Sequence, residues 1–409
     1  MPDSCAAVVH RLRWYVCCAM TAAAFCQLAD ASWAAEPGTP QVTGDVTDVV
    51  VVRSLERHPG SARLWEPYIA QWADRRLVVA FGAGIPEKTD MGDILCCVSP
   101  DDGKSWGEAI PIFDHRRENA AFAYANPVLY HPPAQDVLWC FAMRCPMARP
   151  HSEDSQLAAA YSGDGGRSWI SVELVVHYSG PVIIVGGIQH LDGPAGRRYL
   201  LPVHRNSLRN DPRGSRDQFV LESTSLLEWR LPGATPGDAW LPEHGKEPGF
   251  VPQPADSQVF LHEGQLAPGD NGDLLMMMRT ARYDRPGEAL DPPRAFSSGS
   301  RNGGRTWSPA IAEPDLYNSV AKGFFGRATG GTYLYVYNDG KAFERRALRY
   351  KLKRPDEPWS PERTFFDGSV HNSYPTLLEY APGQFYAVWD SGTVSAHRTA
   401  IRFGKLDLR

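Results

Sequence analysis

The chain alternates between short apolar runs and polar breaks, and most of the runs are shorter than a typical helix. Residues 77–81 (Leu-Val-Val-Ala-Phe) and 331–338 (Gly-Thr-Tyr-Leu-Tyr-Val-Tyr-Asn) are examples, rich in β-branched and aromatic side chains. Gly, Pro, Asn and Asp separate the runs, and no heptads or long stretches of 3.6-residue periodicity appear. Short strand-like runs between turn residues are typical of an all-β fold with many hairpins.

An eight-residue pattern, Ser-x-Asp-x-Gly-x-Ser/Thr-Trp, occurs three times in the chain. The copies span residues 99–106, 162–169 and 300–307, and Asn302 takes the place of the aspartate in the third copy. Each residue type has a task in a β-turn: the Asp or Asn side chain accepts backbone N–H groups, and glycine adopts positive φ. The tryptophan covers the turn with a large apolar ring. Three copies at about the spacing of propeller blades indicate a repeated β-sheet unit.

This pattern is the Asp-box, or BNR, repeat, and the chain resembles the sialidase-like β-propellers. The resemblance implies an all-β, six-bladed β-propeller with Asp-box turns over residues 45–409. We group the apolar runs by the tryptophans that follow them, and this grouping predicts six blades. Residues 47–53 have no hairpin partner nearby, so we expect them to close the ring by pairing with residues 399–406.

The first 35 residues differ from the rest of the chain. Arg11 and Arg13 precede an apolar run over residues 14–29, and small residues follow through Ala35. This order predicts a secretory signal peptide over residues 1–35, cut near Ala34 or Ala35, and hence a secreted or periplasmic protein. The alternative is a disordered start without a targeting role.

The composition excludes several classes of partner. The 409-residue chain has a formal net charge of −5 and is 22% charged, which gives no electrostatic case for nucleic acid or an anionic membrane. No apolar run after residue 35 is long enough to span a bilayer, so we expect no membrane span in the mature chain. The sequence leaves the oligomeric state open.

No cofactor or metal is predicted. Glycine pairs such as Gly186-Gly187 belong to strands and turns and not to a phosphate loop before a helix. Four cysteines remain after the predicted leader, but neither Cys-x-x-Cys spacing nor a partnering His pair accompanies them. They are either buried free thiols or include one disulfide: Cys96, Cys97, Cys140 and Cys145.

The resemblance implies three catalytic residues. Asp90 lies in Thr-Asp-Met-Gly-Asp-Ile (residues 89–94), which resembles the family's Ser-Asp-His-Gly-Asp-Ile and makes Asp90 the candidate acid/base. Tyr374 lies in Asn-Ser-Tyr-Pro-Thr-Leu (372–377), which resembles the segment that bears the nucleophilic tyrosine. Asp256, in Ala-Asp-Ser-Gln-Val (255–259), stands where the family has the glutamate that serves as its base. A neutral phenol suits a sugar with a carboxylate on its anomeric carbon, because a carboxylate nucleophile would be repelled.

Several residues are candidates for substrate binding. Arg279 ends the run Asp-Leu-Leu-Met-Met-Met-Arg (273–279) at the family's carboxylate-binding arginine, and a buried arginine needs a partner. Arg345 fits the family's Arg-x-x-Leu, with Arg346 as the fallback. His204 and His371 stand at predicted strand ends, where a histidine can act as an acid or base near neutral pH but is more often structural.

One position departs from the family. Sialidases begin the first blade with Phe-Arg-Ile-Pro, whose arginine completes a triad around the substrate carboxylate. This chain has Leu-Trp-Glu-Pro (64–67), which places Glu66 in the arginine position. A glutamate there repels an anionic sugar. Arg63 or Arg57 could reach in instead.

These patterns predict a secreted sialidase-like glycoside hydrolase that acts on terminal, anionic sugars of glycans through a tyrosine nucleophile and a carboxylate acid/base. Two alternatives stay open. The first is a propeller hydrolase or lyase that acts on uronic-acid-containing or neutral glycans. The second is a carbohydrate-binding propeller without catalysis, since many propellers only bind.

Overall fold

The computed structural model describes residues 44–409, except 73–74, 87–89, 119, 149–153, 179, 195, 206–216, 235–247, 255–258, 286, 319, 341–344 and 393–397. The predicted signal peptide, residues 1–35, lies outside this part. The described residues form β-strands and short 3-10 helices: η1 (Leu55–Arg57), η3 (His115–Glu118) and η4 (Asp270–Gly272). None of the helices in these ranges is long and apolar enough to cross a membrane.

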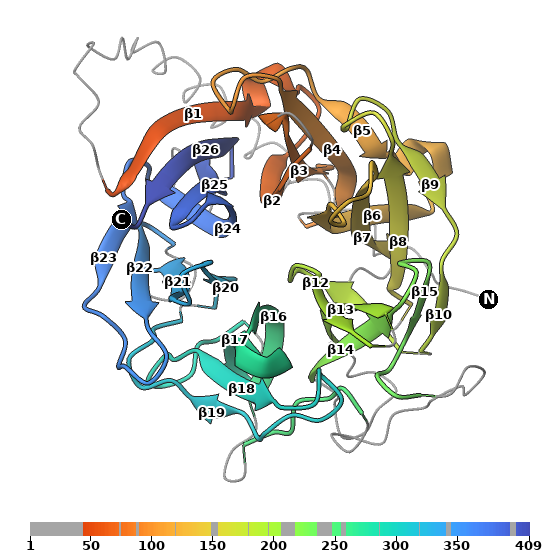
Figure 1. Ribbon diagram of the computed structural model, residues 1–409. Coiled ribbons are helices and arrows are strands. Elements are labelled where there is room, and N and C mark those ends of the chain that lie inside the picture. The colour runs from red at the N-terminus through yellow and green to blue at the C-terminus, as the bar shows by residue number, and fades with distance from the viewer. Residues whose placement is uncertain are drawn as a thin grey trace, which may run out of the picture. The chain divides into compact units, whose positions relative to one another are not determined.

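The strands assemble into five hydrogen-bonded sheets that surround a common centre (Figure 1). Three sheets have four strands each. One contains β16 (Val259–Pro268), β17 (Leu274–Arg282), β18 (Phe296–Ser300) and β19 (Ile311–Ala312). The next contains β20 (Phe324–Arg327), β21 (Tyr333–Asn338), β22 (Leu348–Lys353) and β23 (Arg363–Phe366). The last contains β24 (His371–Ala381), β25 (Gln384–Gly392), β26 (Ala400–Asp407) and β1 (Val46–Ser54).

The other two sheets are larger. A six-stranded sheet contains β10 (Val175–His177), β11 (Ile183–Ile184), β12 (Gln189–Gly193), β13 (Gly196–His204), β14 (Gln218–Ser223) and β15 (Glu228–Arg230). An eight-stranded sheet contains β2 (Arg63–Gln71), β3 (Leu77–Gly84), β4 (Gly92–Ser99), β5 (Ile110–Phe113), β6 (Phe122–Tyr130), β7 (Leu138–Pro146), β8 (Gln156–Ser162) and β9 (Ile170–Val172). Its two halves, β2–β5 and β6–β9, meet through the pair of Gly92 and Tyr124.

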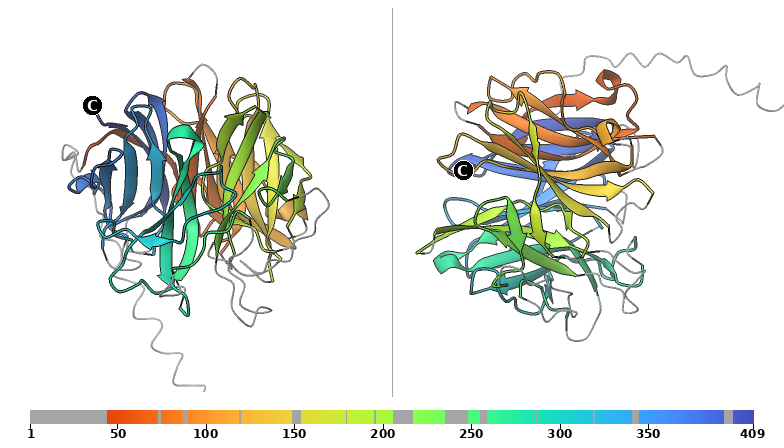
Figure 2. Two further views of the ribbon diagram at one scale, coloured as in Figure 1. Left: turned by 60° about the horizontal axis from the view of Figure 1, so that its bottom comes forward. Right: turned by 90° about the vertical axis from the view of Figure 1, so that its right-hand side faces the viewer.

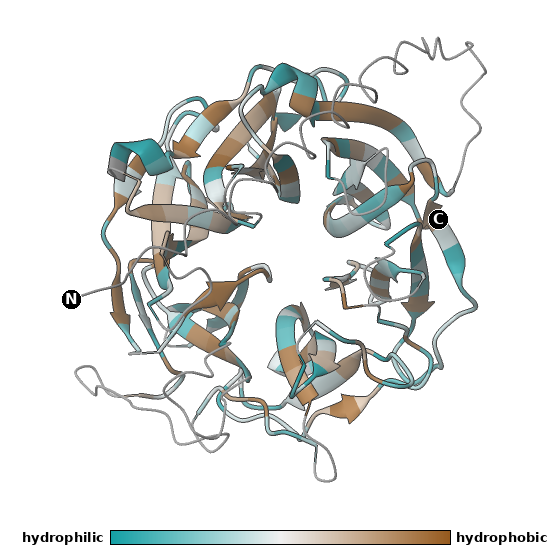
Figure 3. Cartoon of the chain, turned by 180° about the vertical axis from the view of Figure 1, so that it is seen from behind, coloured by the Kyte–Doolittle hydropathy of each residue, from teal (hydrophilic) through white to brown (hydrophobic). Residues whose placement is uncertain are grey.

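The fold is therefore all-β, with a propeller-like arrangement of sheets. Figure 2 shows the sheets standing side by side about the axis of the ring. The sequence predicted six separate blades, whereas hydrogen bonding gives five sheets, because the contact between β4 and β6 merges two groups of strands. Apolar segments concentrate in the strands, and polar segments mark many of the connecting turns (Figure 3).

The first and last described strands close the ring, as the sequence predicted. β1 pairs antiparallel with β26, from Val46 opposite Leu406 to Ser54 opposite Ala400. This pairing joins the first and last strands of the described residues in one sheet. β1 thereby supplies the fourth strand of the sheet that β24, β25 and β26 form, at the end of the strand order.

The Asp-box turns have the geometry that their residue types predict. In the first, the Ser99 hydroxyl donates to Asp101 Oδ1 at 2.9 Å and accepts the Gly103 N–H at 2.9 Å. The same two bonds recur at 2.8 Å in the second copy and at 3.1 and 2.9 Å in the third. Gly103 has φ of 85°, which a residue with a side chain rarely adopts. These bonds are local, so a sequence pattern is sufficient to predict them.

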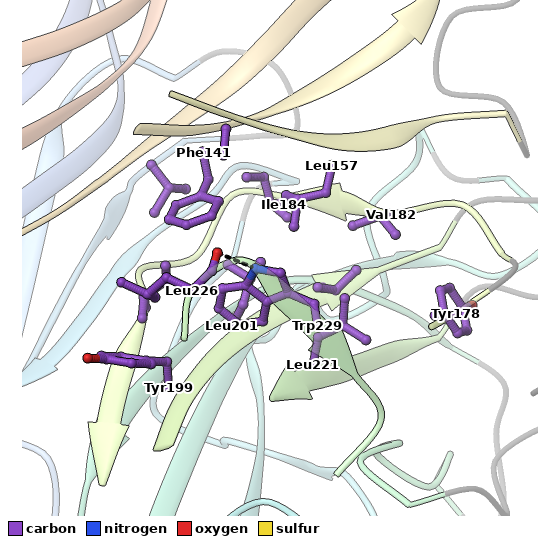
Figure 4. Packing of buried hydrophobic residues seen from close by; sticks show 14 of the residues in the cluster. Phe141, Leu157, Tyr178, Val182, Ile184, Tyr199, Leu201, Leu221, Leu226 and Trp229 are labelled. Carbon is purple, nitrogen blue, oxygen red and sulfur yellow. Dashed lines mark hydrogen bonds between the residues drawn. The ribbon is translucent and has the colours of Figure 1, made fainter. Parts of the chain in front are cut away.

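The turn before Trp229 has the same tryptophan contact without an Asp-box aspartate. The indole Nε1 donates to the carbonyl of Leu226 at 3.1 Å, as Trp106 and Trp307 do to Gly103 and Gly304. Trp229 is fully buried, and its ring meets Phe141 of the neighbouring group of strands edge-on at 5.7 Å (Figure 4). The hydrophobic cores thus lie between adjacent groups of strands.

We expect Trp229→Ala to lower the free energy of unfolding by about 3–5 kcal/mol, because it leaves a large cavity in this core. Equilibrium denaturation in urea measures the change. Ile170→Ala is the control, since this side chain is exposed and its loss should change stability by less than about 0.5 kcal/mol. Equal effects of the two substitutions would contradict the assigned packing.

The structure decides whether the four described cysteines include a disulfide. Cys96, Cys97, Cys140 and Cys145 are all buried, and none of these four forms a disulfide. Burial raises the pKa of the Cys96 and Cys97 thiols to about 12, so they are unreactive near neutral pH.

Candidate active site

Four strands carry a bulge with left-handed backbone at the fourth or fifth residue. These residues are Glu66 in β2, Asn126 in β6, Glu263 in β16 and Tyr374 in β24, with φ of 49°, 57°, 50° and 52°. The strand register shifts at each of them. This conformation costs about 1–2 kcal/mol for a residue with a side chain, and bulges re-aim side chains next to active sites. Strained backbone at equivalent places in four strands therefore marks a candidate site.

Tyr374 is the centre of this site. Its side chain is buried, and its Oη accepts hydrogen bonds from Arg279 Nη1 at 3.2 Å and from Arg345 Nη2 at 3.5 Å. The guanidinium carbons of Arg345 and Arg398 lie 4.9 and 4.8 Å from the centre of its ring. Three arginines from different parts of the chain thus converge on one phenol. Arg279 and Arg345 are two of the residues predicted from the sequence.

Arg279 also pairs with a buried carboxylate. Its Nη1 lies 2.6 Å from Glu263 Oε1, and both side chains are about nine-tenths buried. Burial favours the protonated acid, but the charge and hydrogen bond of Arg279 outweigh it and hold the pKa of Glu263 below its usual range. Glu263 Oε2 and Arg279 Nε are buried without a hydrogen-bond partner. Each of these two atoms therefore has unused hydrogen-bonding capacity, Oε2 as an acceptor and Nε as a donor.

Arg398 is the arginine that lies near Glu66. Its Nη1 lies 3.8 Å from Asp90 Oδ1, and its Nε lies 3.9 Å from Asp390 Oδ2. Asp390 is fully buried and also accepts the backbone N–H of Glu66 at 3.1 Å. The sequence suggested Arg63 or Arg57 as the arginine that could reach in; Arg63 instead donates to Asp90 at 3.0 Å.

Glu66 is itself a buried acid in this cluster. Burial, reinforced by the charge of Glu263, raises the pKa of Glu66 to about 8, against the opposing charges of Arg398 and Lys322. Lys322 is also buried, and its Nζ donates to Thr376 Oγ1 at 3.0 Å. Burial lowers the pKa of Lys322 to about 8. Both groups therefore change charge in a range close to neutral pH.

The other site residues predicted from the sequence have different surroundings from Tyr374. Asp90 is half exposed and forms the ion pair with Arg63. His204 Nδ1 accepts the backbone N–H of Glu263 at 3.3 Å, so this histidine supports the bulge that carries Glu263. His371 is buried, and its Nε2 lies 2.9 Å from Ser373 Oγ. Asp256 lies outside the described residues.

The sequence interpretation missed four residues of the cluster: Glu263, Lys322, Asp390 and Arg398. Glu263 could have been found, since it stands in His-Glu-Gly-Gln (262–265), four positions after Val259, the last residue of the matched motif. The other three have no motif. Lys322 and Arg398 come from segments between strands, and Asp390 follows the apolar run 385–389 in β25.

One group within the described residues has the donor atoms for a metal ion. Oxygen or nitrogen atoms of Asp93, Asp114 and His115 all lie within 4.8 Å of one another. Asp93 Oδ1 already accepts the backbone N–H of His115 at 2.8 Å and lies 2.6 Å from its Nδ1. These contacts hold η3 against β4, and they account for the cluster without a metal.

Comparison with solved structures shows the same fold in several proteins. A protein of unknown function from Dyadobacter fermentans superposes with a TM-score of 0.65 at 16% identity, over 90% of this chain and 100% of that one. The Hadza microbial sialidase Hz136 gives 0.64 at 16% identity, over 86% and 67% of the two chains. An alpha-L-arabinanase from Penicillium chrysogenum, complexed with arabinobiose, gives 0.58 at 12% identity, over 90% and 97%. At such identities the likeness establishes the fold alone.

Comparison with curated protein sequences finds no match. The family model for the BNR repeat-like domain matches residues 74–387, which is more than half of the chain. The Asp-box turns, the ring of sheets and this match agree, and the chain belongs to the BNR repeat-like domain family.

Proposed function

We propose that this protein is a glycoside hydrolase that removes a terminal acidic sugar from a glycan. The observation that carries the proposal is the convergence of Arg279, Arg345 and Arg398 on the buried Tyr374. Arginines bind carboxylates strongly through charge-assisted hydrogen bonds. A sialidase and an arabinanase share the fold, which supports action on a glycan.

We further propose that the fold is a six-bladed propeller. In this interpretation the two halves of the eight-stranded sheet are separate blades whose strand ladders join at one residue pair. Each blade then has an inner strand, and β2, β16 and β24 are three of them (Figure 1). The bulge residues Glu66, Glu263 and Tyr374 would all belong to inner strands, which explains how segments distant in sequence form one site.

In the proposed mechanism Tyr374 is the nucleophile. Its Oη forms a bond to the anomeric carbon, and the phenolic proton passes to Glu263, which takes the role that the sequence assigned to Asp256. Arg279 donates from one nitrogen to both Oη and Glu263 and so holds the nucleophile beside its base. A neutral phenol avoids the repulsion that a carboxylate nucleophile would meet from an acidic sugar.

Asp90 is the proposed acid/base. In its protonated form it donates a proton to the glycosidic oxygen as the bond from that oxygen to the anomeric carbon breaks. Water then attacks the same carbon, its proton passes to Asp90, and the bond to Tyr374 breaks as Glu263 returns the phenolic proton to Oη. Two displacements at one carbon retain its configuration. The half-exposed position of Asp90 suits contact with both the leaving group and water.

Release of 4-methylumbelliferone tests the function directly. We expect turnover of an acidic substrate, the sialoside or the glucuronide, and none of the neutral α-L-arabinofuranoside. Proton NMR of the first product should show retained anomeric configuration. Turnover of the arabinofuranoside alone would refute the acidic substrate.

Glu66 favours a second candidate, a propeller hydrolase or lyase that acts on uronic-acid-containing or neutral glycans, because a glutamate replaces the family's clamp arginine at this position. A lyase would produce an unsaturated uronate with new ultraviolet absorbance and no added water. Secretion or export to the periplasm also remains our proposal, based on the sequence of residues 1–35.

A further inference from the structure

Glu66 has a carboxyl group with unused hydrogen-bonding capacity. The side chain is 9% exposed, and Oε2 is buried without a partner. Its backbone is held on both sides: Asp390 accepts its N–H at 3.1 Å, and Thr376 donates to the carbonyl of the next residue, Pro67, at 2.9 Å. The backbone that carries the carboxyl group is thus held in place, and a buried polar atom without a partner favours a ligand that supplies one.

The charges that face Glu66 come from every side of the cluster. Arg398, before β26, and Lys322, before β20, attract its ionised form; Glu263 of β16 and the half-exposed Asp90, before β4, repel it. The charge of Glu66 also contributes to the raised pKa of Tyr374 of β24, and Asp390 of β25 accepts the backbone N–H of Glu66. His204 Nδ1 accepts the backbone N–H of Glu263.

The charges of these described residues leave an excess of positive charge. Four buried cations, Arg279, Arg345, Arg398 and Lys322, are matched by two buried carboxylates besides Glu66, namely Glu263 and Asp390. Ionised Glu66 and a ligand carboxylate would compete for this excess. Protonated Glu66 would instead donate its O–H to the ligand carboxylate, which is a short and strong kind of hydrogen bond.

We propose that Glu66 is a specificity-determining residue that donates a hydrogen bond, in its protonated form, to the carboxylate of the acidic sugar. Binding of the anionic substrate and ionisation of Glu66 then exclude each other. The inference rests on the proposed function and adds the role of the one position that departs from the arginine of the family pattern. It also explains how a glutamate can stand beside an anionic ligand without repelling it.

The direction of the pH dependence follows from the burial of Glu66. Its pKa is raised to about 8, so the carboxyl is protonated below that pH and the ligand binds. As the pH rises through this value, Glu66 ionises and binding weakens, in the limit about tenfold for each pH unit. Lys322 loses its charge over a similar range and would weaken binding in the same direction, so a variant must separate the two groups.

Calorimetric titration of the whole protein between pH 6 and 9.5 tests the proposal. The probes are 2,3-didehydro-2-deoxy-N-acetylneuraminic acid and 4-methylumbelliferyl glucuronide, with Tyr374→Phe protein for the second so that no turnover occurs. We expect the dissociation constant of the wild-type site to rise steeply above pH about 8. Glu66→Gln keeps a donor that cannot ionise, so its affinity should stay within about threefold of wild type at pH 6.5 and lose the steep rise.

Glu228→Gln is the control, because this carboxylate is half exposed and pairs with His177 outside the cluster; it should behave as wild type. A steep rise that persists in Glu66→Gln would assign the titration to Lys322 and overturn the proposal, as would a wild-type affinity that does not change with pH. If neither probe binds wild type or Glu66→Gln at any pH, the proposed function itself fails. Thermal unfolding of each variant checks that the fold is intact.

Discussion

Tyr374→Phe should lower kcat by at least about 10³-fold while the fold stays intact, since removal of a catalytic nucleophile has effects of this size or larger. The substitution removes one oxygen atom, so Arg279 and Arg345 lose an acceptor, but the ring keeps its place beside Arg398. Without the oxygen no bond to the anomeric carbon can form. Turnover of the 4-methylumbelliferyl substrate that wild type cleaves measures the loss.

The matched control for this prediction is Tyr350→Phe. Tyr350 is equally buried and also makes a hydrogen bond, from its Oη to Asp45 Oδ2 at 2.7 Å, but it lies in β22, away from the arginine cluster. We expect this variant to lose some stability and to keep its kcat. If Tyr374→Phe retained more than about a tenth of wild-type kcat, Tyr374 would not be the nucleophile.

Arg279→Ala should destabilise the protein by about 3–5 kcal/mol, because it leaves the buried Glu263 carboxylate without its partner. The pair is joined at 2.6 Å, and neither side chain has significant access to water that could replace the contact. Urea denaturation at pH 7 measures the loss. Activity should also disappear, since the same nitrogen binds Tyr374.

A double variant separates stability from catalysis at this pair. Arg279→Met combined with Glu263→Gln removes both charges and retains most of the volume, so it should recover most of the lost stability. It should not recover turnover, because both the orienting arginine and the proposed base are absent. Recovery of activity would contradict the mechanism. A failure to recover stability would show that other groups of the cluster depend on Arg279.

The sequence predicted best those features that local contacts determine. The all-β class follows from short apolar runs, and the bonds from Ser99 to Asp101 and Gly103 join residues at most four positions apart. Tyr374, Arg279 and Arg345 were found from motifs, and the structure brings them together. The pairing of residues 47–53 with 399–406 was predicted from the absence of any nearer partner, and β1 and β26 do pair.

The missed features depend on geometry that has no signature in an apolar pattern. A bulge reverses which face a residue points to, so the position of Glu263 cannot be read from alternation along β16. Arg398 comes from a segment between strands, yet it approaches the ring of Tyr374. The sequence therefore showed that Glu66 stands where the family has an arginine. It did not show that Arg398 lies beside Glu66.

Because the ring closes through the pairing of β1 with β26, it can close only when synthesis of the chain is nearly finished. The four valines at 49–52 leave the ribosome early, and their partners at 400–407 leave it about 350 residues later. At ordinary rates of translation this delay is on the order of tens of seconds. Throughout that time the nascent chain exposes an unpaired, apolar strand edge, which is a template for aggregation. The bond from the Glu66 N–H to Asp390 cannot form earlier either, since 324 positions separate the two residues. We therefore expect protection of residues 46–54 by a chaperone during this delay to raise the yield of folded protein.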